Sequence, residues 1–173
     1  MGMGRKGGDT MTNFEEIFNR ALHRIEKDTD FFSYYHVESQ SDVKELIRQQ
    51  LTSYLYDAID KIYDKGTPKI NFYDYNIELQ EFNIDLTKRE IGLLSNLMFL
   101  VYLERQEAML GAFKMKMTPS DLSVFSPAAE RNSFLNLVKD VRQECDIALS
   151  RYFSTDREDL KRKMIDHSQY DYS

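Results

Sequence analysis

The sequence predicts an all-α fold: a single-domain bundle of about four long helices, with an irregular arm between helices 2 and 3 and an extended C-terminal tail. Apolar residues recur at helical spacing in four long stretches, helix start signals precede them, and no stretch alternates cleanly as a β-strand would. The 173 residues are enough for one domain with a sizeable core. We therefore expect a disordered N-terminus at residues 1–11, a helical domain at 12–154 and a tail at 155–173.

A capping residue introduces each of the first two helices. Thr12 and Glu15 have the spacing of a capping box, and an apolar stripe follows them over a predicted helix at about 13–27. Ser41 is placed to cap a second amphipathic helix at about 42–64. A glycine and a proline just beyond this second helix form a strong stop signal.

Residues 69–85, which we call the arm, are the least regular part of the domain. Ile77 and Leu79 show a fragment of alternation, so a strand, a hairpin and a loop all remain open. Aromatic side chains in an irregular segment either tuck into the core or anchor a partner. The arm is therefore a candidate contact segment, and its aromatic residues are Phe72, Tyr73 and Tyr75.

The third helix, predicted at 85–113, should lie at the centre of the core. Thr87 and Glu90 form a second capping-box spacing at its start. The thirteen residues from 91 to 103 carry no charge, and apolar side chains fall on nearly every side of the helix. Such a helix must be buried by several neighbours, and it is too short for a bilayer, which takes about 20 residues.

A short turn at 118–121 leads to the last helix, predicted at 127–153 with proline at its first position. The residues that follow are charged and then aromatic and polar, and they lack the apolar surface to fold alone. We expect one further helical turn around Leu160. The aromatic pair at the end of the tail, Tyr170 and Tyr172, favours contact with a partner.

Composition narrows the classes of partner. The net charge of −6 and the pI near 5.1 argue against a general affinity for DNA, which normally needs a basic face. The single cysteine, Cys145, excludes an intramolecular disulfide framework and fits a reducing cytosol. Its place in a helical pattern favours a core or half-buried residue over a nucleophile. No apolar segment of a signal peptide follows the N-terminal glycines and basic residues.

The sequence lacks the signatures of catalysis. There is no phosphate-binding glycine loop and no cysteine or histidine spacing for zinc, and His23 is expected at the boundary of its helical stripe. Glu104 and Glu107 lie one turn apart near Arg105, which favours surface charges over a general acid/base pair. We therefore expect a binding or assembly protein with no cofactor, no metal and no enzymatic activity.

Three phrases together resemble a known family. They are VKELIRQQLTSYLYDAIDKIY at 43–63, NIDLTKREIGLLSNLMFLVYLERQ at 83–106, and the phrase from Thr118 to Ser154 in which Phe125-Ser126-Pro127 opens the last helix. In this order they resemble the small helical head–tail connector, or adaptor, proteins of tailed bacteriophages. The resemblance covers roughly residues 13–154, and its motifs are structural rather than catalytic.

The resemblance implies a structural virion protein at the neck, made in the host cytoplasm. Such adaptors form a ring of identical subunits, commonly a dodecamer, which completes the head and extends the DNA channel from the portal protein toward the tail. The implied partners are further copies of the chain, the portal protein and a downstream neck or tail protein. Genomic DNA would pass through without specific binding, in keeping with an acidic chain that repels phosphate, and no membrane is involved.

The resemblance also assigns roles to two segments. The C-terminal segment of such adaptors docks on the portal, which implies a docking role for residues 155–173 and for Met164, Ile165, Tyr170 and Tyr172. The irregular insert of the family faces the channel or the next ring, which implies a contact role in the arm for Phe72, Tyr73, Tyr75 and Ile77. The alternative is a soluble helical phage-encoded regulator that binds one protein and forms no ring.

Overall fold

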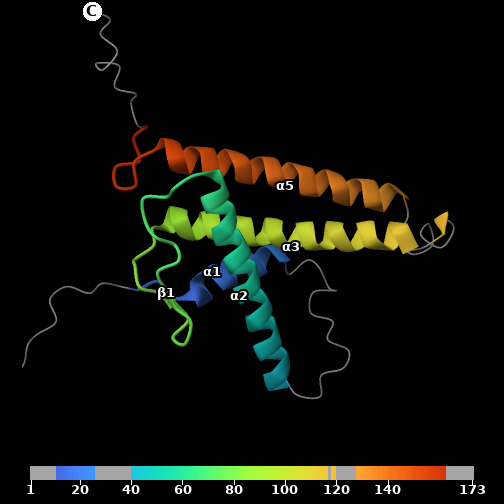
Figure 1. The fold of residues 1–173 in the computed structure, drawn as a ribbon, viewed down its shortest axis with the longest axis horizontal. Helices are drawn as coiled ribbons and strands as arrows, with labels where there is room; N and C mark the ends of the chain where they lie inside the picture. The colour runs from blue at the N-terminus through green and yellow to red at the C-terminus, as the bar shows by residue number, and fades with distance from the viewer. Residues whose placement is uncertain (1–10, 26–39, 117, 120–127, 163–173) are drawn as a thin grey trace, which may run out of the picture.

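The computed structural model describes residues 11–25, 40–116, 118–119 and 128–162. The described residues form four helices and one small two-stranded sheet (Figure 1). This arrangement confirms the predicted all-α bundle with an irregular segment between its second and third helices. The helices are α1 (Phe14–Ile25), α2 (Gln40–Lys65), α3 (Lys88–Lys116) and α5 (Ala128–Ser154), and the strands are β1 (Tyr75–Asn76) and β2 (Glu81–Phe82).

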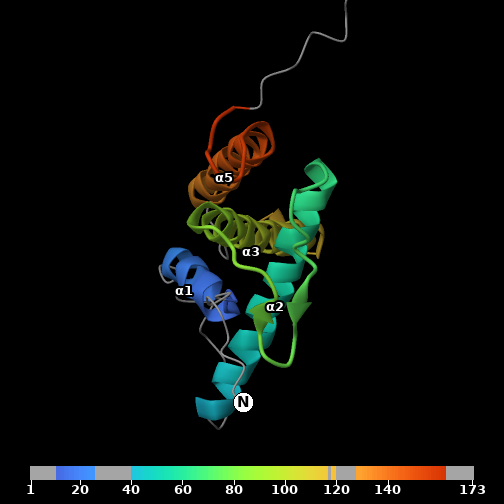
Figure 2. The same ribbon diagram turned by 90° about the vertical axis from the view of Figure 1, so that its left-hand side faces the viewer.

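Helix α3 is the centre of the molecule, as its uncharged run predicts. It packs against α1, α2 and α5, and Figure 2 shows it between α5 on one side and α1 with α2 on the other. Buried side chains on several faces of α3, including Leu94, Leu97 and Met98, join the other helices in one continuous apolar core. None of the helices in the described part of the chain has the length and hydropathy of a membrane span.

The capping box at the start of α3 forms as its spacing predicts. The Thr87 backbone N–H donates to Glu90 Oε2 at 2.7 Å, and the Glu90 backbone N–H donates to Thr87 Oγ1 at 3.2 Å. These two bonds satisfy donors that the first turn of a helix otherwise leaves without partners. Glu90 itself is 1% exposed, so its carboxylate is held inside the protein at the beginning of the helix.

The prediction that Thr12 caps α1 is wrong. Asn13 is the cap, because its Oδ1 accepts from the Glu15 backbone N–H at 2.8 Å. Thr12 is buried instead, and its Oγ1 accepts from the backbone N–H of Leu86 at 2.8 Å. The local spacing predicts that this hydroxyl group caps α1, but it binds the backbone of a residue 74 positions away. This hydrogen bond connects the segment before α1 to the segment that leads into α3.

The ends of the other helices lie close to their predicted positions. Helix α2 begins at Gln40, so Ser41 lies inside its first turn and does not precede it as a cap. Helix α5 begins at Ala128, one residue after the predicted start. Residues 120 and 121 of the short turn predicted at 118–121 lie outside the described residues.

The arm is a short antiparallel hairpin, which decides among the three forms that the sequence leaves open. Tyr75 pairs with Phe82, and Asn76 pairs with Glu81. At the turn, Asn76 Oδ1 accepts from the backbone N–H groups of Glu78 and Leu79, at 2.9 and 3.1 Å. The next residue, Gln80, has φ of 52°, the left-handed conformation that lets the chain reverse in so few residues.

The predicted tail begins later than residue 155. After α5 the chain folds back on itself, and Thr155 forms an antiparallel bridge with Arg162. Leu160 lies in this return with φ of 57°, so the predicted helical turn around it is wrong. Side chains from the returning segment reach the start of α3, as described below, and residues 155–162 therefore belong to the folded body.

Candidate functional site

The side of the arm that faces the body is part of the core. Phe72 and Phe82 are both fully buried, and the Phe82 ring lies edge-on to Phe14 with ring centroids 5.1 Å apart. Phe72 also lies against Tyr152 of α5, at 6.1 Å between ring centroids. The prediction of a contact role for Phe72 is therefore wrong, because a fully buried side chain does not reach a partner in the folded protein.

One face of α2 holds the two tyrosines of the arm. Tyr75 stacks on Tyr56 with ring centroids 5.4 Å apart and is half-buried between α2 and the hairpin. Tyr73 stacks on Tyr63 at 4.5 Å, and its phenol donates to Asp60 Oδ1 at 2.7 Å. This hydrogen bond is the main reason that the pKa of Tyr73 rises to about 12.

The hairpin is also fixed from its other edge. The Phe14 N–H donates to the Gln80 carbonyl at 2.8 Å, and the Phe82 N–H donates to the Thr12 carbonyl at 2.8 Å. The residues just before α1 therefore pair with β2 on the side away from β1, with Asn13 opposite Glu81. With α2 on one side and this edge on the other, the arm is a rigid part of the domain.

The tip of the hairpin is the exposed part of the arm. Ile77 and Leu79 are 62% and 61% exposed, whereas Tyr73 is 46% exposed and partly covered by α2. Large apolar side chains held in solvent on a rigid turn are typical of protein contact sites. Of the four predicted contact residues, Ile77 and Tyr73 are accessible, Tyr75 is only half-accessible and Phe72 is enclosed. Leu79, which the sequence marks only by alternation, belongs with the accessible group.

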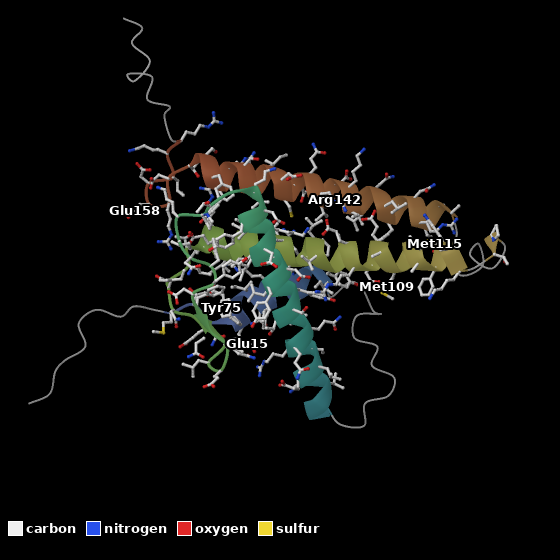
Figure 3. The ribbon with its side chains drawn as sticks, viewed as in Figure 1. Glu15, Tyr75, Met109, Met115, Arg142 and Glu158 are labelled. Atoms are coloured by element: carbon white, nitrogen blue, oxygen red, sulfur yellow. The ribbon has the colours of Figure 1, made fainter. Side chains whose placement is uncertain are left out.

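The arm is also strongly acidic. The arm, residues 69–85, has one basic residue, Lys69, and four acidic ones: Asp74, Glu78, Glu81 and Asp85. Figure 3 shows Tyr75 and Glu15 near one another at this end of the molecule, so a carboxylate of α1 adds to the same region. Glu15 forms an ion pair with Arg48 at 2.5 Å, which leaves the hairpin itself as the main source of negative charge.

The segment after α5 is attached to α3 by polar contacts. Arg157 donates to both carboxylate oxygens of Glu90, at 2.8 and 3.0 Å, and to the Asp85 carbonyl at 2.6 Å. Arg89 donates to Thr155 Oγ1 at 2.5 Å, and Lys69 forms an ion pair with Asp156. We call this set of contacts the latch. It fixes the direction in which the chain leaves the domain.

A small cavity lies beside the latch. Its volume is about 20 Å³, room for about one water molecule, and its lining includes Glu90, Tyr152 and Arg157. The Tyr152 hydroxyl is buried and has no hydrogen-bond partner among the described residues, and burial raises the pKa of this phenol. The predicted docking residues Met164, Ile165, Tyr170 and Tyr172 lie beyond the latch, outside the described residues.

A second accessible apolar region lies at the far end of α3. There Met109 is 53% exposed and Met115 is 85% exposed, and Figure 3 places both at the opposite end of the molecule from Tyr75. The sequence does not single out this region, because its uncharged run ends at residue 103 and Met115 lies beyond the helix predicted at 85–113. The sequence feature that indicates exposure of Met115 is its position between two charged residues, Lys114 and Lys116.

The remaining polar groups have structural contacts. Arg142 of α5 forms ion pairs with Glu104 at 3.2 Å and Glu107 at 3.0 Å, in keeping with their predicted role as surface charges. Cys145 is 2% exposed, as expected for a core residue, and burial raises the pKa of its thiol to about 11. His23 is exposed, as predicted. Within the described ranges, no group of three or more His, Cys, Asp or Glu residues is arranged to hold a metal ion.

Comparison of the chain with protein family models, with curated proteins and with solved structures finds no match.

Proposed function

We propose that this chain is a structural virion protein, a subunit of an adaptor ring that lies between the portal and the tail of a bacteriophage. In this role it completes the head, extends the DNA channel and performs no catalysis. The proposal rests on the resemblance of the three sequence phrases together with one structural observation. That observation is the rigid hairpin, which holds Ile77 and Leu79 in solvent at 62% and 61% exposure.

Rigidity is what makes the exposed tip informative. A flexible loop loses conformational entropy when a partner orders it, whereas a turn that is already fixed avoids most of this cost. Asn76 Oδ1 accepts from two backbone N–H groups of the turn, and the Phe14 N–H donates to the Gln80 carbonyl, so the turn is fixed before any partner arrives. Exposed isoleucine and leucine favour a protein partner for the tip over a channel wall along which DNA slides.

The charge of the chain fits the same role. A net charge of −6 gives phosphate no general binding surface, so DNA could pass a ring of such subunits without being trapped. In the proposed assembly the arm contacts a neighbouring protein subunit, and the segment beyond the latch docks on the portal.

The test is assembly with the portal protein encoded by the same phage. The purified chain and the portal are mixed, the mass of the complex is measured by light scattering, and the complex is imaged by electron microscopy. We expect a closed ring seated on the portal. A chain that remains a monomer and never joins the portal contradicts the adaptor role and favours the regulator that forms no ring.

A pair of variants tests the contribution of the hairpin tip. Ile77→Asp combined with Leu79→Asp should weaken ring formation at least about tenfold, because it places charge in an apolar contact. The matched control is Ile147→Asp on α5, where the native side chain is 45% exposed and lies outside the arm. Equal loss in both variants would remove the hairpin tip from the proposed interface.

A further inference from the structure

Two of the accessible apolar regions among the described residues, the hairpin tip and the end of α3, differ in the sign of their local charge. At the hairpin tip, Ile77 and Leu79 lie among Glu78 and Glu81, and the chain has no basic residue between 70 and 87. At the end of α3, Met109 and Met115 lie with Lys114 and Lys116, and the chain has no acidic residue between 108 and 120.

The lysines at the end of α3 are available to a partner. Both are exposed, and neither forms an ion pair with another described residue. Met115 between them is 85% exposed, a high value for a large apolar side chain. At the hairpin, Glu78 is exposed and Glu81 is half-buried, so the negative charge there is accessible as well.

The two regions are far apart on the same subunit. The hairpin lies at one end of the long axis of the molecule, and the last turns of α3 lie at the other (Figures 1 and 3). They therefore cannot neutralise one another within one chain. Two different, complementary patches on one subunit are the requirement for a heterologous contact, which closes into a ring when the rotation between copies permits.

We propose that the hairpin tip of one copy binds the end of α3 in a second copy of the same chain. Ile77 and Leu79 pack against Met115, while Glu78 and Glu81 lie opposite Lys114 and Lys116, which flank Met115 in the second copy. This contact deepens the proposed ring function, because it names the partner of the exposed hairpin.

Disulfide trapping in the isolated full-length chain tests this contact. Leu79→Cys and Met115→Cys are prepared as separate variants, one with a mass tag, and an equimolar mixture is oxidised under mild conditions at high protein concentration. The native Cys145 stays in place, because it is buried and its thiol pKa is about 11. We expect the mixed Leu79–Met115 species to exceed the two like-with-like species.

The control replaces one partner by Ile147→Cys on α5, where the native side chain is also accessible, at 45% exposure. If this control is trapped as well as the Leu79–Met115 pair, or if the like-with-like species dominate, the proposed contact is wrong. Absence of any covalent dimer from the Leu79 and Met115 mixture also overturns it.

Charge reversal supplies a second, independent measurement. Glu78→Lys with Glu81→Lys in the hairpin variant should lower the mixed species about fivefold, since exposed ion pairs contribute modestly. Lys114→Glu with Lys116→Glu in the other variant should do the same, and combining the two reversed variants should restore the yield. Failure of the combination to restore it, with helix content unchanged by circular dichroism, would contradict the pairing of these charges.

These measurements use this chain alone, so they are independent of the portal. If trapping succeeds but the chain never joins a portal, the contact stands and the adaptor role fails. If the chain forms a ring on the portal while the Leu79–Met115 pair is not trapped, the adaptor role stands and the ring uses other surfaces.

Discussion

At the scale of single residues, the Arg157–Glu90 pair shows how a buried charge is stabilised in this protein. The Glu90 side chain is 1% exposed, whereas that of Arg157 is 29% exposed. A carboxylate taken out of water is costly unless it is both paired and hydrogen-bonded. Glu90 meets both conditions, since Thr87 donates to it within the capping box and Arg157 donates from the far end of the chain.

Arg157→Ala should lower the free energy of unfolding by about 2 kcal/mol, because it leaves Glu90 buried without its cation. The partial exposure of Arg157 keeps the loss below the value for a fully buried pair. Urea unfolding followed by circular dichroism measures the change. The control is Arg162→Ala, whose side chain is exposed and which should change stability by less than about 0.5 kcal/mol.

A second variant separates charge from packing. Glu90→Gln combined with Arg157→Met removes both charges and keeps a residue that suits the capping box. It should destabilise less than Arg157→Ala alone, because no buried charge is left without a partner. A larger loss in the double variant would show that the latch acts through the shape of its side chains.

At the scale of elements, the arm combines a core strand pair with an exposed turn. Phe72 and Tyr73 lie in a turn just before β1, and they have opposite environments although they are adjacent. Phe72 is fully buried, and Tyr73 is 46% exposed on the surface of α2. The same local sequence thus supplies both core packing and a contact surface.

Phe72→Ala should lower the free energy of unfolding by about 3–5 kcal/mol, since it removes a buried ring and leaves a cavity. Tyr73→Ala should cost about 1 kcal/mol, because it loses one ring stack and one exposed hydrogen bond. Chemical denaturation of the two variants side by side provides the comparison. Similar losses would mean that the two faces of the arm are not distinct in solution.

At the scale of the whole molecule, α3 is a spine whose two ends differ. Its first turns meet α1, the arm and the latch, and its last turns carry Met109 and Met115 away from the hairpin, beside the start of α5 (Figure 1). Burial is therefore concentrated in the first half of the helix, and every buried residue of α3 lies between Glu90 and Leu103. The last turns of α3, by contrast, have exposed side chains at Met109 and at residues 114–116.

Deletion of residues 169–173 should leave helix content and the melting temperature nearly unchanged while weakening docking on the portal about tenfold or more, because Tyr170 and Tyr172 are predicted anchors. The latch lies before the deletion and holds the folded body without it. Thermal melting and a binding titration with the portal protein measure the two effects. If the deletion unfolds the domain, the end of the chain belongs to the core and the docking assignment is wrong.

The sequence by itself determined the four helices and the central position of α3. These features depend on local signals, namely helical periodicity, the Thr87–Glu90 capping box and the uncharged run at 91–103, which act over a few residues. It also marked the arm as a contact candidate and Cys145 as a core residue. The sequence left the form of the arm open, because each strand of the hairpin has only two residues, too few to show the alternation of a β-strand.

Only the tertiary structure decided which side chains are accessible. Phe72 and Ile77 are both large apolar residues of one segment, and their burial differs because α5 covers one while the turn holds the other in solvent. Thr12 does not cap α1 and instead accepts a hydrogen bond from the Leu86 backbone. Arg157 donates to Glu90, which is 67 positions away in the sequence. Such partners are chosen by packing between distant elements, and the hydrogen bonds of a buried polar group go to whichever neighbour the fold brings near.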